Sequence, residues 1–265
     1  MEPLLVAGCA AGGLIIGDAL EPLCDRLPNK LTLDQPWFRC PNCKMADVGI
    51  GQIPIVRVLY RNRPCPECGE TRAHPFRPAV QGLVTAAVMI GLAVRFGPDL
   101  ALAAFSVIGI ALVAISVIDI QSHMIPNRIL YPAVFIAAPL LVITAAVDHR
   151  WGSLWHAAVA AVVGFVALFM VRFAYPKGMG FGDVRLAGLV GGATGWMGFR
   201  AAFVAFFLMF LLGSIGGILQ ILVTKSSRRA HIGFAPYMAA GCLIVVIFTI
   251  PLMRFLHPVL HGPGS

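Results

Sequence analysis

The sequence predicts an all-α polytopic membrane protein with about eight transmembrane helices and one small polar domain between the first two. Two properties of the 265-residue chain support this prediction: 58% of its residues are apolar, and only 12% are charged. Its mean hydropathy is +0.85. A soluble domain carries roughly a quarter charged residues, and a disordered chain is more polar still. Both of those classes are therefore excluded.

Eight apolar stretches approach the length of about 20 residues that crossing a bilayer requires. They lie at about residues 3–22, 80–96, 100–118, 129–147, 153–172, 184–199, 201–223 and 233–253. The sixth is short and glycine-rich, so its ends are the hardest to place. The chain accordingly divides into a first transmembrane helix (1–22), a polar domain (23–79), a membrane domain (80–258) and a C-terminal tail (259–265).

The first apolar stretch is interpreted as a retained helix, although its position would also suit a signal peptide. It lacks a basic segment before the apolar run. Asp18 and Glu21 also occupy the region where a cleavage site with small residues is expected.

The distribution of Lys and Arg predicts the orientation of the chain. With eight alternating crossings, 16 of the 20 basic residues fall on the side of the polar domain. The positive-inside rule places that side in the cytoplasm and both termini outside. One miscounted helix would reverse the side of everything after it. The net charge of +8 is then explained by the basic residues on the cytoplasmic side of the membrane. Membrane lipid is an expected partner, and no nucleic-acid partner is expected.

Four of the seven cysteines form two Cys-x-x-Cys pairs in the polar domain, Cys40 with Cys43 and Cys65 with Cys68. This doubled spacing lets four thiolates converge on one tetrahedral zinc ion. The alternative is a pair of disulfides, which a cytoplasmic location disfavours. Because sulfur fills all four positions, we expect one structural zinc ion that stabilises a small cytoplasmic domain.

Acidic residues are scarce in the membrane half: only Asp119, Asp148 and Asp183 occur after residue 100. Asp148 lies in a polar loop, where an acid is unremarkable. Asp119 ends the third apolar stretch and Asp183 precedes the sixth, so both are predicted at the cytoplasmic membrane boundary. Ionisable residues at the edge of membrane helices are candidates for function.

Two carboxyl groups at one membrane depth can activate water. One ionised Asp takes a proton from water, while its protonated partner polarises a carbonyl group. Gly178, Gly180 and Gly182 precede Asp183 and have no Cβ, so an extended peptide is expected to approach the backbone closely there. Either aspartate taken alone is better explained as an ordinary helix-end acid beside an arginine, whereas the two together, with the glycine run and the Ile-Pro-Asn turn, favour the catalytic pair.

Helix dipoles suggest separate roles for the two acids. Asp183 lies at a helix N-terminus, which favours the charged form, and Asp119 lies at a C-terminus, which disfavours it. Asp183 is therefore predicted to be the base and Asp119 the proton donor.

The residues around both aspartates resemble the bacterial type IV prepilin peptidases and, more widely, the Gly-x-Gly-Asp aspartic membrane proteases. The family motif Gly-Met-Gly-x-Gly-Asp-x-Lys-Leu is similar to Gly178–Leu186, with Arg185 in place of Lys. The family's first catalytic aspartate and its Ile/Leu-Pro-Asp/Asn turn match Asp119 and Ile125–Asn127. Its four-cysteine zinc module matches the two cysteine pairs. The resemblance extends over nearly the whole chain.

This resemblance implies a bacterial inner-membrane aspartic endopeptidase that uses Asp119 and Asp183. Its substrates would be type IV prepilins or type II secretion pseudopilins, each with a short basic leader joined to an apolar helix. A second implied activity is N-methylation of the new amino terminus, with S-adenosylmethionine as the methyl donor.

Three segments depart from the family pattern. Gly17-Asp18-Ala19-Leu20-Glu21 differs from the family's opening run, and Gln81 stands where the family has Glu. Both lie in the region that the family associates with methyl transfer, so the peptidase assignment rests on better-matched residues. The family's late Ile-Pro-Phe-Gly-Pro run becomes Ile232-Gly233-Phe234-Ala235-Pro236.

Two other functions compete with the peptidase. A transporter could use Asp119 and Asp183 to bind a proton or cation, but it predicts acids near the bilayer midplane and broken helices there. A non-catalytic assembly protein could use the zinc domain as a docking platform. Release of a leader peptide distinguishes all three.

Overall fold

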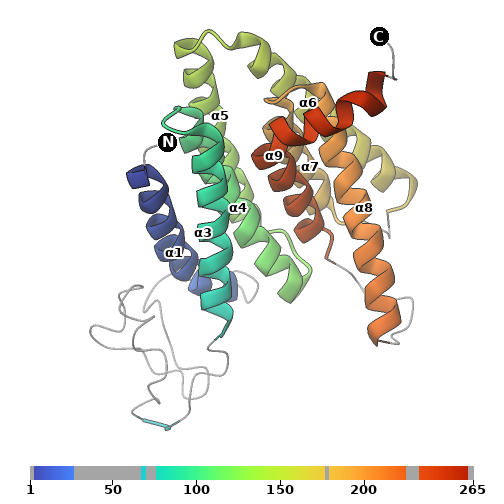
Figure 1. Cartoon of the computed structure of the whole chain (residues 1–265). Coiled ribbons are helices and arrows are strands. Elements are labelled where there is room, and N and C mark those ends of the chain that lie inside the picture. Colours follow the sequence, from blue (N-terminus) through green and yellow to red (C-terminus); the bar gives the residue numbers. More distant parts are fainter. Residues whose placement is uncertain (1–2, 27–66, 70–75, 177–178, 225–232, 262–265) are drawn as a thin grey trace.

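A computed structural model of the chain describes residues 3–26, 67–69, 76–176, 179–224 and 233–261. Within these ranges the secondary structure is helical (Figure 1). The helices are α1 (Pro3–Arg26), α3 (Phe76–Phe96), α4 (Ala101–Ser122), α5 (Asn127–Val147), α6 (Trp151–Ala174), α7 (Phe181–Gly195), α8 (Phe199–Thr224) and α9 (Ala235–His261). Each corresponds to one of the eight predicted stretches, which confirms the all-α class.

Five of these helices are long and apolar enough to cross a membrane: α1, α4, α5, α6 and α8. The apolar parts of α3 and α9 are shorter, at Val80–Phe96 and Ala235–Thr249, and α7 has 15 residues. The chain is therefore a multi-pass membrane protein with five long candidate spans among its described residues. Residues 27–66 and 70–75, which hold most of the predicted zinc domain, lie outside the described residues.

Most predicted boundaries move by a few residues, and two of these movements concern the aspartates. Helix α4 continues to Ser122, past the predicted end at 118, and the His123 N–H still donates to the Asp119 carbonyl oxygen at 2.9 Å. Helix α7 begins at Phe181, before the predicted start at 184. An apolar run ends where polarity begins, but backbone hydrogen bonding continues through a polar residue. Both aspartates consequently lie inside helical turns.

Helix α4 lies at the centre of the bundle, where it contacts α1, α3, α5 and α9. The other helices pack mainly in pairs: α1 with α3, α6 with α7, and α8 with α9. Small residues bring these pairs together. A Cβ on Gly191 would overlap the carbonyl oxygen of Ala160, and one on Gly17 would lie 2.7 Å from the Cα of Gly82. Such close backbone approach is a common way for membrane helices to associate.

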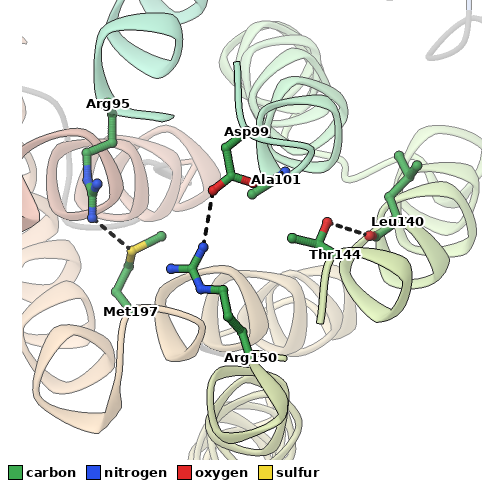
Figure 2. Close-up of polar contacts among 7 residues, drawn as sticks. All are labelled: Arg95, Asp99, Ala101, Leu140, Thr144, Arg150 and Met197. Carbon is green, nitrogen blue, oxygen red and sulfur yellow. Dashed lines mark hydrogen bonds and ion pairs between the residues drawn. The ribbon is translucent and has the colours of Figure 1, made fainter. Parts of the chain in front are cut away.

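Polar contacts join the helices at the end of the bundle far from Asp119 (Figure 2). Oδ1 of Asp99 accepts the N–H of Ala101, the first residue of α4, at 2.8 Å. Its other oxygen accepts a hydrogen bond from Nη1 of Arg150 at 3.2 Å. The Arg150 guanidinium also lies 5.6 Å from the ring centroid of Trp196. These contacts link the α3–α4 connection to the start of α6 and the end of α7.

Candidate active site

Asp183 lies in the first turn of α7 and is partly buried. Gly180, in an extended conformation with φ −70° and ψ 149°, precedes the helix, and its N–H donates to Oδ2 of Asp183 at 3.1 Å. An acid at the third helical position satisfies a backbone donor at the helix start and is favoured by the positive end of the dipole. The local sequence therefore fixes the orientation of this carboxyl group.

Asp119 lies in the last turn of α4, and only 4% of it is exposed. Its Oδ2 accepts the backbone N–H of Ala235, the first residue of α9, at 3.0 Å. A Cβ on Gly233 would overlap this carboxyl group, so the backbone before α9 passes directly against it. Glycine is the residue that permits such an approach.

The two carboxyl groups lie at the same end of the bundle, where the α4–α5 turn that follows Asp119 contacts the residues on either side of Asp183, although the two acids are far apart in the sequence. Each accepts one backbone N–H at a helix N-terminus, Asp183 at α7 and Asp119 at α9. Asp119 was assigned the role of proton donor from the C-terminus of α4 alone. Because Asp119 also lies against the start of α9, helix dipoles do not distinguish a base from a proton donor.

The turn between α4 and α5 holds the start of α7 in place. A Cβ on Gly182 would lie 2.8 Å from the Cβ of Ile125, so Ile125 occupies the space that this glycine leaves. Nη1 of Arg185 donates to Oδ1 of Asn127 at 2.7 Å. The guanidinium of Arg185 also lies 4.5 Å from the ring centroid of Phe181. This turn therefore joins the helices that carry the two acids.

The glycines before Asp183 were predicted to admit a substrate backbone. Gly178 lies outside the described residues. A Cβ on Gly180 would lie 3.2 Å from Oδ2 of Asp183, and the space beside Gly182 is taken by Ile125. The missing side chains at positions 180 and 182 thus serve contacts within the chain, and substrate approach there stays a prediction.

Of the four predicted zinc ligands, Cys40, Cys43 and Cys65 lie outside the described residues. Cys68 is exposed in a turn that ends at Gly69, whose φ of 66° suits glycine. Among the described residues, no group of three or more His, Cys, Asp or Glu side chains is placed to hold a metal ion.

Sequence reasoning missed the contacts that Gly233 and Ala235 make with Asp119. The family comparison drew attention to their segment but not to its partner. One signal was present: Pro236 follows Gly233-Phe234-Ala235 at the start of an apolar stretch, a pattern typical of a helix N-terminus with unsatisfied N–H donors. Such donors indicate a nearby acceptor, although they do not identify which one.

Known proteins are similar to this chain in the region that contains both aspartates. The sequence model of the type IV leader peptidase family matches residues 106–222, which include both aspartates. A "Prepilin leader peptidase/N-methyltransferase" of Bacillus subtilis is 30% identical over 245 residues, which cover 92% of this chain and 94% of the relative.

Two further relatives carry the same name. The one from Burkholderia pseudomallei strain 1026b is 27% identical over 88% of this chain and 74% of its own length. The one from Aeromonas hydrophila is 25% identical over 86% and 79%, respectively. No solved structure gives a significant match. The Bacillus subtilis relative is 30% identical to this chain, and the alignment covers almost the full length of both proteins. The chain therefore belongs to the type IV leader peptidase family.

Proposed function

We propose that the chain is an aspartic endopeptidase that removes the basic leader peptide from type IV prepilins or type II secretion pseudopilins. The observation that supports this most directly is the location of Asp119 and Asp183 at the same end of the bundle, where the α4–α5 turn joins the helices that carry them. The names of the relatives supply the class of substrate. A substrate of this kind joins a cytosolic leader to an apolar membrane helix, and its cleavage point lies at the membrane boundary.

The proposed chemistry needs one ionised and one protonated carboxyl group. Like charges in close approach favour a singly protonated pair. The ionised group takes a proton from water, and the water oxygen bonds to the carbonyl carbon of the scissile peptide. The protonated group donates its proton to the carbonyl oxygen. The C–N bond then breaks as the departing nitrogen takes the proton that the first group removed from water, and the carbonyl oxygen returns its proton to the second group. The backbone donors of Gly180 and Ala235 hold the two carboxyl groups in position for these transfers.

The proposed orientation follows from the basic residues. The cytoplasmic side of the bacterial inner membrane carries the polar segment, both aspartates and the connections before α5, α7 and α9, while both termini lie outside. Membrane lipid then surrounds the exposed apolar side chains of the helices.

We also propose the second activity, N-methylation of the amino terminus that cleavage creates. S-adenosylmethionine would supply the methyl group. Near the positions where the sequence departs from the family, the structure buries polar groups: Asp18 and Gln81 are each 5% exposed. Nε2 of Gln81 donates to Sγ of Cys24 at 3.5 Å. Mass spectrometry of the mature product tests the activity, because one added methyl group is expected and an unmodified amino terminus would refute it.

A structural zinc ion bound by Cys40, Cys43, Cys65 and Cys68 completes the proposal. Four thiolates are a donor set that suits tetrahedral zinc and leaves no open position for catalysis. We expect one zinc ion per purified chain by elemental analysis, and loss of that ion when Cys68 is replaced by Ser. A protein that binds no zinc in its reduced state would favour the disulfide alternative.

The decisive experiment is cleavage of a prepilin by the purified protein in detergent. Asp119→Asn and Asp183→Asn should each abolish release of the leader. Asp148→Asn is the matched control, since Asp148 is exposed beyond the end of α5 and should leave the rate unchanged. If the wild-type protein releases no leader but moves protons or cations across vesicles through the same two acids, the transporter is the better description.

A further inference from the structure

A groove runs along the membrane part of the bundle between α5, α6 and α7. Its volume is about 620 Å³, and its lining is almost wholly apolar. Tyr131 and Arg185 are the polar side chains that line it, and both lie toward the end of the bundle that carries Asp183. One end of the groove is thus polar and next to the candidate active site, whereas the remainder is apolar.

The groove exists because α5 stands away from its neighbours. Helix α5 packs mainly against α4 and makes few contacts with α6 or α7. On the groove side of α5, Val134 remains 36% exposed and Val142 44% exposed. A membrane helix with apolar side chains on this face can therefore be accommodated between α5 and the α6–α7 pair.

Helix α7 carries two sets of glycines with different surroundings. Gly191 and Gly195 face α6, and a Cβ on either would overlap α6 atoms. Gly188 and Gly192 line the groove, and the nearest atoms to a Cβ there would be 3.7 and 3.5 Å away, which is ordinary contact. Packing within the chain therefore explains the first pair and not the second. A glycine inside a helix also destabilises it relative to alanine.

We propose that this groove receives the apolar helix of the membrane substrate, which lies parallel to α7 with its leader end toward Asp183. This inference rests on the proposed peptidase function. The substrate must reach the turn of α7 that holds Asp183, and the groove begins at Phe181 and Arg185 of that same turn. From Phe181 to Ala193 it follows α7 for about 18 Å, which matches roughly the first half of a transmembrane helix.

The angular positions on α7 predict the path of the substrate backbone. At 100° per residue, Asp183 lies on nearly the opposite side of α7 from Phe181 and Arg185. A chain that leaves the groove must cross the N-terminal end of α7, a distance of about 10 Å, to reach Asp183. About three extended residues span this distance. The scissile bond therefore lies in an extended segment just before the substrate helix begins.

A lipid acyl chain is the competing occupant. Acyl chains fill apolar grooves without requiring any backbone approach, so a lipid gives no reason for glycines at positions 188 and 192. Two glycines four residues apart on a groove-lining face are typical of surfaces where two helix backbones meet. This feature favours a helix.

Groove-filling variants and two substrates test the proposal. Gly188→Leu and Gly192→Leu should lower the cleavage rate of full-length prepilin about tenfold or more, because each new side chain occupies the space in which the substrate helix backbone would approach α7. Neither change should affect a soluble peptide that spans the cleavage point but lacks the apolar helix. Gly12→Leu is the matched control, because a Cβ at Gly12 of α1 meets nothing within 4 Å. Peptide cleavage also reports that each variant is folded.

Crosslinking provides a measurement that does not depend on turnover. A photoreactive residue replaces Val142, in the groove, or Val162, which is 63% exposed on α6 and outside the groove lining. The Asp183→Asn background holds full-length prepilin uncut. An adduct with prepilin is expected at position 142 and not at 162.

The outcomes separate the two proposals. Lipid adducts alone at position 142, or full-length cleavage unaffected by Gly192→Leu, overturn the groove assignment while leaving the peptidase intact. Cleavage that survives Asp183→Asn for both substrates instead overturns the peptidase mechanism.

Discussion

The backbone N–H of Ala235 donates to Oδ2 of Asp119 across 116 residues of sequence, at 3.0 Å. The donor is the first residue of α9 and the acceptor lies in the last turn of α4, so two helix ends meet at one carboxyl group. Asp183 has the corresponding arrangement with Gly180 at α7. Both carboxyl groups thus accept hydrogen bonds from backbone N–H groups, and substitution of other side chains does not remove these donors.

Removing the donor at residue 235 should impair catalysis more than folding. Ala235→Pro eliminates the N–H, and proline is well tolerated at the first position of a helix. Since a hydrogen bond to a charged group contributes about 1.5–3 kcal/mol, kcat should fall by about tenfold to a hundredfold with little change in KM. Steady-state cleavage kinetics measure this, with thermal unfolding as the folding control. An unchanged kcat would show that this hydrogen bond does not orient Asp119 for the reaction.

Gly233→Ala should displace the carboxyl group of Asp119. The added Cβ overlaps Oδ2 in the observed geometry, and the backbone there has to move to relieve the overlap. We expect a loss of cleavage activity of at least about tenfold, because small misplacement of a reacting group lowers the rate steeply. Gly8→Ala is the control, since a Cβ at Gly8 meets nothing within 4 Å. Equal activity of the two variants would contradict the close approach.

Arg185 and Asn127 should act as one unit. Their hydrogen bond of 2.7 Å joins the α4–α5 turn to the start of α7. Arg185→Ala and Asn127→Ala should each slow cleavage, and the double variant should be little worse than either alone, because residues in contact show non-additive effects. A double-mutant cycle on kcat/KM measures this coupling. Strictly additive losses would mean that the two residues act separately.

The ion pair between Asp99 and Arg150 should matter for stability and not for cleavage. It lies beside the start of α4, whereas Asp119 lies near the other end of that helix, and both side chains are partly exposed. Figure 2 shows the contact. Arg150→Gln should therefore lower the free energy of unfolding by no more than about 1 kcal/mol and leave kcat/KM unchanged. Thermal unfolding in detergent and a cleavage assay check the two parts. A large loss of activity would reveal a connection between the two ends of the bundle.

The helices could be predicted from the sequence because each is an apolar run bounded by polar residues. The ends of α4 and α7 could not, since hydropathy falls at Asp119 and Asp183 while helical hydrogen bonding continues past both. The pairing of the two acids, predicted from their scarcity and their common depth, stays a prediction, and the structure places both at the same end of the bundle. The prediction itself needs no three-dimensional information.

The backbone contacts of the site were beyond sequence reasoning. Whether Ala235 lies against Asp119 depends on how α9 packs on α4, which the local pattern does not encode. Gly182 was predicted to let a substrate backbone approach. In the structure the space left by its missing side chain is occupied by Ile125 of the same chain. The zinc site stays a prediction, because three of its four cysteines lie outside the described residues.

The central helix α4 contributes both to the groove, through Ile108, and to the acid pair, through Asp119. The two residues are eleven positions apart on nearly the same side of the helix, a rise of about 17 Å. If the groove holds the substrate helix as proposed, a substrate atom that reaches Ile108 lies at a fixed distance from the carboxyl group of Asp119. Cleavage would then occur at a constant number of residues before the contact, whatever the side chains at the cut.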